Sequence, residues 1–275
     1  MMCAWKELLS ILPPRFRREV DSLGKESMQE LRLRINAPPE LLLSGKVYWI
    51  TGNVTQDELN FVINTASRYS PWSAATAAQG YITAPGGHRI GMCGKAIYKN
   101  GAVAGIQEVH FLCIRVARDF SGIGKKATGF SGSILILGAP GWGKTTLLRD
   151  VIRQLAETET VCVVDERGEL FPSGFSRGKR MDVLTGCPKP AGIEMVLRTM
   201  GPSCIAVDEI TAQADCGALI QASNCGVRLL ATAHAASVQD LLNRSVYRPL
   251  VENRIFEMLL ILRRDKSYIV ERMTL

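Results

Sequence analysis

Residues 133–146 read SILILGAPGWGKTT and contain the complete pattern G-x-x-x-x-G-K-[ST], which runs from Gly138 to Thr145. The apolar run SILIL before the first glycine has the composition of a buried strand, and TTLLRDVIRQLAE after the loop has apolar residues at helical spacing. This strand–loop–helix context gives a short pattern a specific meaning. The stretch therefore predicts a phosphate-binding loop, with a nucleoside triphosphate as its ligand.

The residue types of this loop match the chemistry of phosphate binding. Its glycines permit backbone conformations that a side chain would block, so that successive N–H groups can surround phosphate oxygens. The helix that follows directs the partial positive charge of its N-terminus to the same place. We expect Lys144 to bind the β- and γ-phosphates of ATP, and the Thr145 hydroxyl to bind Mg²⁺. The predicted nucleotide-binding residues are Gly138, Ala139, Pro140, Gly141, Trp142, Gly143, Lys144, Thr145 and Thr146.

Length and composition are those of an ordinary globular protein. The 275 residues are enough for a nucleotide-binding core and a second, smaller domain. The net charge of +7 permits an anionic partner without requiring one, because phosphate ligands alone would use part of it. No stretch approaches the ~18 apolar residues of a membrane span. We therefore expect a cytoplasmic protein whose role at a membrane depends on a partner.

The eight cysteines form no C-x-x-C pair and no metal-ligand spacing with histidine. Cys162 and Cys204 lie within apolar runs, which is typical of small core residues. This usage favours a reducing cytoplasm over a disulfide framework.

The composition of the sequence changes at residues 119–132, which read DFSGIGKKATGFSG, are rich in Gly, Ser and Lys and have no hydrophobic periodicity. We place a linker at residues 120–132, between an N-terminal α+β domain at 1–119, with a docking or regulatory role, and a nucleotide-binding domain at 133–275. In the first domain, strands are expected over residues 30–36 and 41–52, with a tight turn at Ser44 and Gly45. Thr55 and Glu58 form a capping-box pair before a helix, and hairpins are expected to turn at 85–87 and 100–101.

Apolar strands alternate with helical segments after the linker. The expected strands are residues 133–138, 160–166, 203–209 and 227–234, with helices after the phosphate loop, at 192–200 and at 211–224. Such alternation predicts a parallel sheet with helices on both faces. Residues 256–264 and 267–275 are expected to form a closing strand pair.

The strand CIAVDEI (residues 204–210) ends in two acidic residues. In enzymes with a phosphate loop, such a strand lies beside the loop and its terminal Asp faces Mg²⁺. Asp208 fits that role, and Glu209 is placed to polarise the attacking water. Read alone, two acids at a strand end are as often a strand reaching the surface, but their pairing with the phosphate loop favours a hydrolytic site.

Two further polar groups follow strands of the same predicted sheet. VVDERGE places Asp165 and Glu166 after the second strand, and ATAHA places Thr232 and His234 after the fourth. Ligands of open α/β sheets bind outside the carboxyl ends of the strands. His234 is therefore a candidate sensor of the γ-phosphate, although a lone histidine at a strand end is more often a structural cap.

The order GAPGWGKTT, VVDERGE, LRTMGPSCIAVDEI and ATAHA resembles the secretion-superfamily ATPases of type II and type IV systems. ELRLRINAPPELLL, YITAPGGHRIGMCGKA and DVLTGCPKP extend the similarity over nearly the whole chain, to a family of mother-cell ATPases of endospore-forming bacteria. The resemblance implies an α/β fold with a RecA-like phosphate-loop ATPase core and a smaller N-terminal α+β domain. It assigns Glu166 to an acidic box, Glu209 as the catalytic glutamate and His234 to a histidine box. Asp208 departs from the many secretion ATPases that have Gly before the glutamate.

The resemblance also implies partners and a place in the cell. It implies a homo-oligomer, a hexameric motor that uses ATP and Mg²⁺ and docks on a membrane-anchored platform protein of the channel between mother cell and forespore. An arginine supplied by the neighbouring subunit completes many ring ATPase sites. Arg198 is favoured here, because LRTMGPSCIAVDE resembles the arginine-bearing stretch of secretion ATPases. The other candidates are Arg115, Arg118, Arg177 and Arg180.

Two other functions remain open from the sequence. A RecA-like nucleic-acid motor would use the same loop chemistry, but no aromatic and basic RNA-binding signature is present and the basic residues are dispersed. An ATP-gated scaffold with little turnover is the second alternative, and Glu209 argues against it. The absence of an N-K-x-D motif makes a GTPase a weaker reading still.

Overall fold

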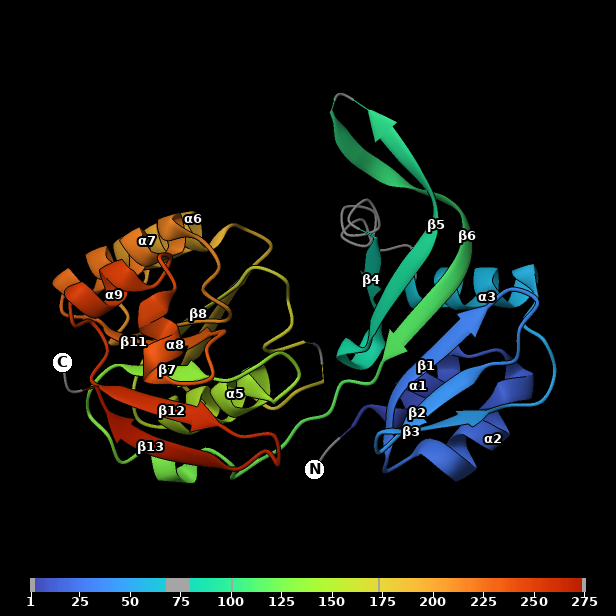
Figure 1. Cartoon of the computed structure of the whole chain (residues 1–275), viewed down its shortest axis with the longest axis horizontal. Helices are drawn as coiled ribbons and strands as arrows, with labels where there is room; N and C mark the ends of the chain where they lie inside the picture. The colour runs from blue at the N-terminus through green and yellow to red at the C-terminus, as the bar shows by residue number, and fades with distance from the viewer. Residues whose placement is uncertain (1–2, 68–79, 100, 173, 274–275) are drawn as a thin grey trace. The chain divides into compact units, whose positions relative to one another are not determined.

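The computed structural model describes residues 3–67, 80–99, 101–172 and 174–273. The chain forms two compact units (Figure 1). Unit 1 contains the residues up to Arg118 together with Gly174 and Phe175, and unit 2 contains Asp119–Pro172 and the chain from Ser176 onwards.

Unit 1 is built on an antiparallel sheet with the strand order β3-β2-β1-β6-β5-β4. The strands are β1 (Met28–Arg34), β2 (Glu40–Leu43), β3 (Lys46–Trp49), β4 (Tyr81–Thr83), β5 (Arg89–Lys99) and β6 (Ala102–Arg115). The predicted turn between β2 and β3 is confirmed, with positive φ angles of 47° at Ser44 and 83° at Gly45. The 3₁₀ turn η1 (Pro85–Gly87) joins β4 to β5, as expected. Of the next predicted turn, Asn100 lies outside the described residues.

Helices cover one face of this sheet, whereas the other face is at least partly exposed and carries ion pairs. The helices are α1 (Trp5–Ile11), α2 (Pro14–Gly24) and α3 (Gln56–Ser67), and their apolar residues pack against alternate residues of the strands. The predicted capping box of α3 is confirmed: the Glu58 amide donates to the Thr55 hydroxyl at 3.3 Å, and the Thr55 amide donates to the Glu58 carboxylate at 2.9 Å. On the other face, Arg32 pairs with Glu30 and Arg34 with Glu40.

Unit 2 contains a mostly parallel sheet with the order β13-β12-β7-β11-β10-β8-β9. The strands are β7 (Ile134–Leu137), β8 (Val161–Asp165), β9 (Met181–Thr185), β10 (Cys204–Val207), β11 (Arg228–Ala233), β12 (Met258–Leu262) and β13 (Tyr268–Arg272). Only the predicted closing pair, β12 with β13, is antiparallel among these neighbours. β11 lies between β7, which leads into the phosphate loop, and β10, which leads to Asp208.

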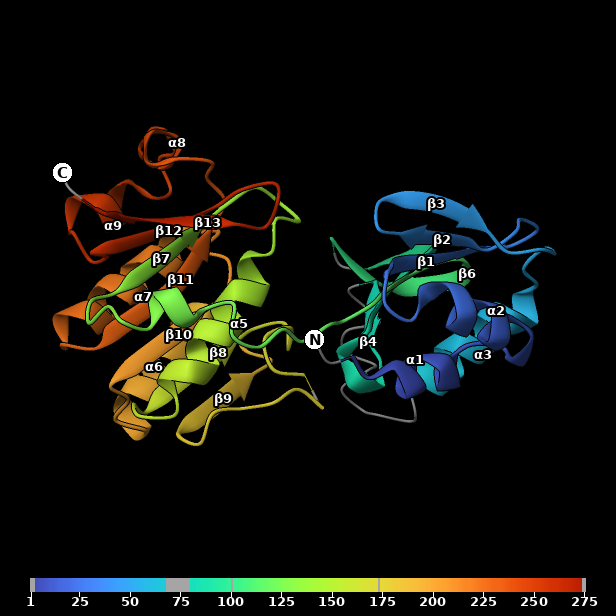
Figure 2. The ribbon, with the colours of Figure 1, turned by 90° about the horizontal axis from the view of Figure 1, so that it is seen from below.

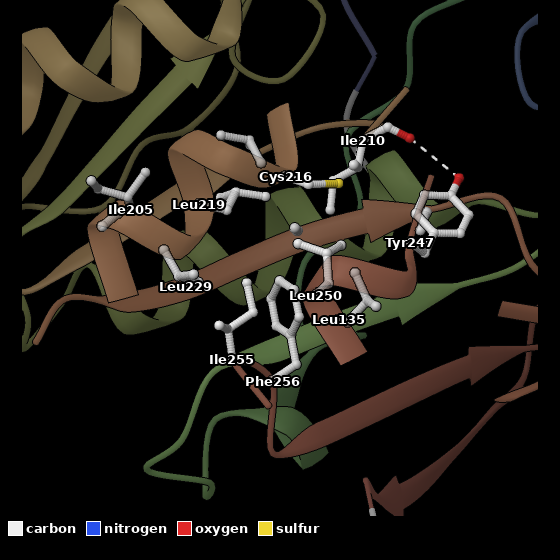
Figure 3. Packing of buried hydrophobic residues seen from close by; sticks show 14 of the residues in the cluster. Leu135, Ile205, Ile210, Cys216, Leu219, Leu229, Tyr247, Leu250, Ile255 and Phe256 are labelled. Carbon is white, nitrogen blue, oxygen red and sulfur yellow. Dashed lines mark hydrogen bonds between the residues drawn. The ribbon is translucent and has the colours of Figure 1, made fainter. Parts of the chain in front are cut away.

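Helices lie on both faces of this sheet, as predicted (Figure 2). α5 (Lys144–Leu155) covers one face with the residues of one apolar cluster. α6 (Lys189–Thr199), α7 (Gln213–Asn224), α8 (Val238–Asn243) and α9 (Arg248–Glu252) pack with the other face in a second cluster (Figure 3). Burying alternate residues of each strand on opposite faces is what makes these strands continuously apolar in sequence.

The segment expected to be a linker belongs to unit 2. It contains the short 3₁₀ turn η2 (Lys125–Ala127), and the amides of Gly122 and Gly124 donate to the Asp150 carboxylate of α5 at 3.1 and 2.7 Å. Throughout the described ranges, no helix has both the length and the apolar character that crossing a bilayer requires.

Candidate functional site

The loop between β7 and α5 has the backbone that a phosphate-binding loop needs. Gly141 and Gly143 have φ angles of 74° and 101°, in the left-handed region that disfavours any side chain. Gly143 precedes Lys144, the first residue of α5, so the helix N-terminus opens onto the loop. Trp142, one of the predicted nucleotide-binding residues, is half-buried and packs against the apolar cluster beneath α5.

The Lys144 ammonium is buried at the centre of this loop. Its Nζ donates to the carbonyls of Gly138 at 2.8 Å and Ala139 at 3.2 Å, and it lies 2.9 Å from Nδ1 of His234. The side chain is only 7% exposed, and this burial lowers the pKa of Lys144, partly offset by the negative charges of Asp208 and Glu209. The three hydrogen-bond partners of the ammonium are uncharged groups.

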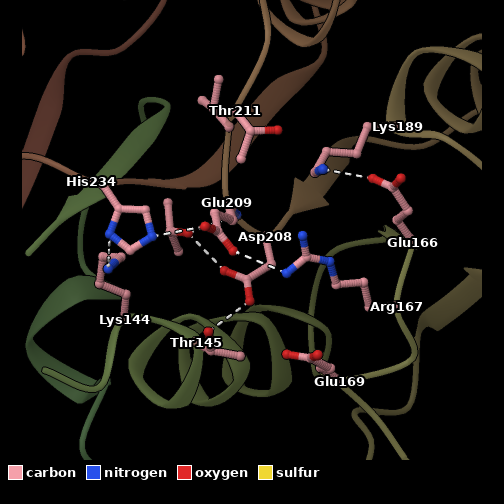
Figure 4. A network of polar contacts seen from close by, with 12 residues as sticks. Lys144, Thr145, Glu166, Arg167, Glu169, Lys189, Asp208, Glu209, Thr211 and His234 are labelled. Atoms are coloured by element: carbon pink, nitrogen blue, oxygen red, sulfur yellow. Dashed lines mark hydrogen bonds and ion pairs between the residues drawn. The ribbon is translucent and has the colours of Figure 1, made fainter. Parts of the chain in front are cut away.

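Asp208 lies at the end of β10, where two threonine hydroxyls hold its carboxylate (Figure 4). Thr145 of α5 donates to Oδ2 at 2.7 Å, and Thr232 of β11 donates to Oδ1 at 2.7 Å. These are hard oxygen ligands of the kind that Mg²⁺ prefers, and two of them, the Thr145 hydroxyl and the Asp208 carboxylate, are already in contact. The residues present therefore fit a magnesium ion, which would need nucleotide and water oxygens as its other ligands, since no three-residue His, Cys, Asp or Glu cluster in the described ranges could hold a metal alone.

Glu209 follows Asp208 in a backbone conformation that few residues adopt. Its φ of 51° is left-handed, and the Thr232 hydroxyl accepts a hydrogen bond from its amide at 2.8 Å. Its carboxylate lies 2.8 Å from Nε2 of His234 and 3.5 Å from the Arg167 guanidinium. Strained backbone at a carboxylate of this kind is characteristic of functional sites.

His234 joins Lys144 to Glu209, and these contacts assign its tautomer. The ammonium can only donate, so Nδ1 accepts from Lys144; Nε2 then has the hydrogen and donates to the Glu209 carboxylate. The chain Lys144–His234–Glu209 thus links the phosphate loop to the end of β10 through one neutral imidazole.

The loop after β8 brings the acidic box to the same edge of the sheet. Asp165 is 3% exposed and accepts hydrogen bonds from the amides of Glu169, Leu170 and Phe171, so it fixes the loop itself, and burial raises its pKa. Glu166 faces Lys189 at 2.7 Å rather than the phosphate loop. A cleft at this edge is lined by five carboxylates and two cations: Asp165, Glu166, Glu169, Asp208, Glu209, Arg167 and Lys189.

The structure thus brings together most of the residues singled out from the sequence. Lys144, Thr145, Asp208, Glu209 and His234 form one connected group, and Glu166 lies in the adjoining cleft.

The arginines proposed to act between subunits lie elsewhere in the chain. Arg198 is in the last turn of α6, three-quarters exposed and paired with Glu194 at 2.6 Å. Arg115 pairs with Glu30, whereas the other three donate to backbone carbonyls, with Arg180 also donating to the Thr160 hydroxyl. Arg198 does not join the group within one chain, and its role across a subunit interface stays a prediction.

Two contributions to the site were missed from the sequence. Lys189 forms the wall of the cleft beside Glu166, and Arg149 of α5 donates to the carbonyls of Glu169 and Leu170, which anchors the acidic loop to the helix after the phosphate loop. The only sequence signal was indirect: Arg149 interrupts the apolar face of α5 and is 7% exposed.

A model of the family described as "Sporulation stage III, protein AA" matches residues 4–270 of the chain. The chain is 33% identical to Stage III sporulation protein AA of Bacillus subtilis (strain 168) over 283 residues, a match that covers 95% of the chain and 92% of that protein. The resemblance drawn from the sequence motifs is confirmed.

Solved structures of secretion ATPases resemble the whole chain. The pilus retraction motor PilT, solved with bound ADP, aligns with a TM-score of 0.63 at 14% identity over 98% of this chain and 82% of that one. The ATPase DotB of Legionella pneumophila aligns with a TM-score of 0.58 at 18% identity over 95% and 80%. These likenesses confirm the predicted fold class, an α/β chain with a RecA-like core and a smaller N-terminal α+β part.

Proposed function

The chain belongs to the sporulation stage III protein AA family, and on this premise we propose that it is an Mg²⁺-dependent ATPase. We infer that ATP hydrolysis powers the assembly of, or transport through, a secretion-like channel between mother cell and forespore. The protein would act as a cytoplasmic motor that reaches the membrane through a platform protein.

The observation that carries this proposal is the buried ammonium of Lys144 in the phosphate loop. A buried charge is costly unless an opposite charge or strong hydrogen bonds compensate it. Here the bonded partners are two loop carbonyls and an imidazole, which are all neutral, and burial lowers the pKa of the lysine. An incoming phosphate would add a negative charge in direct contact with the ammonium, so the site favours an anion at this point.

The remaining residues fit the positions that hydrolysis requires. Thr145 and Asp208 would hold Mg²⁺, which when bound neutralises charge on the phosphates. Glu209 would orient the attacking water and accept its proton. Thr232 would keep Asp208 and Glu209 in register, because one hydroxyl bonds the carboxylate of the first and the amide of the second. His234 would report the presence of the γ-phosphate, because it contacts both Lys144 and Glu209.

The oligomeric state and the partners are part of the same proposal. We expect a homo-oligomer, most simply a hexamer, in which Arg198 of one subunit reaches the nucleotide of the next. Arg198 is three-quarters exposed at the end of α6, which leaves it accessible to a neighbour. The domain at 1–119 would provide the docking or regulatory surface, and the domain at 133–275 would hydrolyse ATP.

The test is Mg²⁺-dependent ATP turnover per subunit over a wide range of protein concentration, with Lys144→Ala as the blank. A specific rate that rises with concentration and is lost in the blank is the expected result, because sites completed between subunits need assembly. Arg198→Ala should then lower the rate without lowering nucleotide affinity in the isolated chain. Turnover indistinguishable from the blank at every concentration, with nucleotide still bound, would favour the ATP-gated scaffold. Stimulation by DNA or RNA would favour the nucleic-acid motor.

A further inference from the structure

The turn between β12 and β13 lies against the phosphate loop (Figure 2). β12 runs parallel to β7, so the turn after it, residues 263–267, leaves the sheet at the same edge as the loop. Nζ of Lys266 in this turn donates a hydrogen bond to the carbonyl of Gly141, within the loop. Lys266 is therefore a second lysine, besides Lys144, whose ammonium binds a carbonyl of the phosphate loop.

The backbone of Lys266 is in a conformation that normally favours glycine. Its amide donates to the Arg263 carbonyl at 3.0 Å, and the Arg263 amide donates to the Ser267 carbonyl at 2.8 Å, which defines a three-residue hairpin loop. The last residue of such a loop is left-handed and usually Gly. Lys266 occupies it with a φ of 70°, at a conformational cost. Strain of this kind, at the edge of a site, points to a role for the side chain.

Packing at the end of β12 fixes this turn relative to the loop. A Cβ placed on Gly138 would lie 3.1 Å from the Cβ of Leu262, the last residue of β12, so the strand end and the start of the loop are in close contact. A Cβ on Gly143 would lie 3.9 Å from Cδ of Lys266. The aliphatic stem of Lys266 thus runs alongside the loop, and its ammonium is held at the Gly141 carbonyl, within the loop.

We propose that Lys266 is a second phosphate-binding cation, supplied by the same chain, which exchanges the Gly141 carbonyl for phosphate oxygens when a nucleotide binds. This inference rests on the proposed function and extends the nucleotide site to the C-terminal hairpin. An ammonium can donate three hydrogen bonds on a flexible stem, which suits such an exchange. Hydrogen bonds from a cation to an anion are stronger than those to a neutral carbonyl. The nucleotide would then lie between the two lysines, with Asp208 and Glu209 beyond Lys144.

The test is the dissociation constant of ATP, measured by calorimetry on the full chain, for three variants of the turn. Lys266→Gly removes the side chain and suits the left-handed backbone, so the thermal unfolding midpoint without nucleotide should stay the same or rise. ATP affinity should fall about tenfold, the usual value of one charge-assisted hydrogen bond. Lys266→Arg should retain most of the affinity. Arg264→Ala, which removes the same charge from the same turn, is the matched control and should bind ATP nearly as the wild type does.

The measured ATP affinities either support or overturn the proposed role of Lys266. Weaker ATP binding by Lys266→Gly at unchanged or higher stability supports it, because a purely structural lysine would not weaken binding when its backbone strain is relieved. Wild-type affinity in Lys266→Gly, or an equal loss in Arg264→Ala, would overturn it and leave only the general effect of positive charge. If the wild type and Lys144→Ala both fail to bind ATP, the proposed function itself fails, and this inference fails with it.

Discussion

The interior of unit 1 around His88 and the strand edge of unit 2 around His234 hold an imidazole in two different ways. His88 is fully buried, and both partners are backbone groups: the Ala117 amide donates to Nδ1 at 3.1 Å, and Nε2 lies 2.9 Å from the Ala4 carbonyl. His234 is half-exposed, and both partners of its ring are ionisable side chains.

The two rings have the same tautomer, because each accepts at Nδ1 and donates from Nε2. Their difference lies in the partners. The backbone amide and carbonyl that bond His88 are uncharged and fixed by the fold. The ammonium and the carboxylate that bond His234 are charged side chains, which can respond to an incoming phosphate. Both rings have hydrogen bonds at both nitrogens, so this feature alone does not distinguish them. The chemical class of the bonded partners separates a structural histidine from one placed to respond to a ligand.

Apart from the loss of Glu209 itself, the largest expected effect comes from removing the Thr232 hydroxyl at the strand edge. Thr232→Val has nearly the same shape but removes the hydroxyl that bonds Asp208 and the Glu209 amide. Because small displacements of catalytic groups can cost about 100-fold in rate, we expect kcat to fall by that order while KM for ATP changes little. Steady-state kinetics measure both constants. Thr232→Ser, which keeps the hydroxyl, should retain most of the rate, and an unchanged kcat in Thr232→Val would remove the positioning role.

A smaller effect, on the free energy of unfolding rather than on the rate, is expected from substitution of His88. His88→Gln leaves the Ala117 amide or the Ala4 carbonyl without its partner in the interior, which costs about 2 kcal/mol of unfolding free energy. Denaturant unfolding measures this cost. The exposed His110 is the matched control, and His110→Gln should change stability by less than about 0.5 kcal/mol. Equal stabilities for the two variants would contradict the structural role of His88.

His88 should also make the stability of unit 1 depend on pH, and the sign of this dependence follows from the direction of its pKa shift. Burial lowers the pKa of His88 below its ordinary value. The stability that depends on its neutral form is therefore present above about pH 6.5, the value for an unfolded chain, and is lost as the pH falls towards the folded-state pKa. Unfolding free energies at about pH 7.5 and about pH 5.5 should differ more in the wild type than in His88→Gln. A pH dependence that is the same in both would assign the effect to other groups.

The sequence predicted those parts of the fold and of the site that are formed by residues close together in the chain. The phosphate loop, the capping box of Thr55 and Glu58 and the closing strand pair follow from local spacing, and each has the predicted form. The strand ends that converge near the loop could also be predicted, because the carboxyl ends of parallel strands share one edge.

Other elements left no clear local signal. β9 is an edge strand whose residues are at least partly exposed, so MDVLT lacks the continuous apolar run of β8 or β10. The short helices α8 and α9 are too brief to show a periodicity. The contacts of Lys266 with Gly141 and of Glu166 with Lys189 join residues that only the tertiary fold brings together.

The smallest expected effect is on the reactivity of the thiols of unit 2, where buried and exposed cysteines should differ. Burial raises the pKa of Cys204 to about 12 and that of Cys162 to about 11, whereas Cys225 is exposed. Only thiolates react readily. Alkylation of the native protein at about pH 8, followed by mass spectrometry, should modify Cys225 well before the two buried residues, with no loss of ATP turnover. Early modification of Cys204 would contradict its burial.

The most direct test of the nucleotide site follows bound ATP over time in the wild type and in Glu209→Gln. Both proteins should bind ATP with Mg²⁺ at similar affinity, because the Glu209 carboxylate contacts His234 and Arg167 rather than the loop carbonyls that surround Lys144. The wild type should convert the bound ATP to ADP, and Glu209→Gln should retain it uncleaved with a rate lower by a factor of about 100 to 10,000, the range for loss of a general base. Cleavage by Glu209→Gln at the wild-type rate would contradict the assignment of the site.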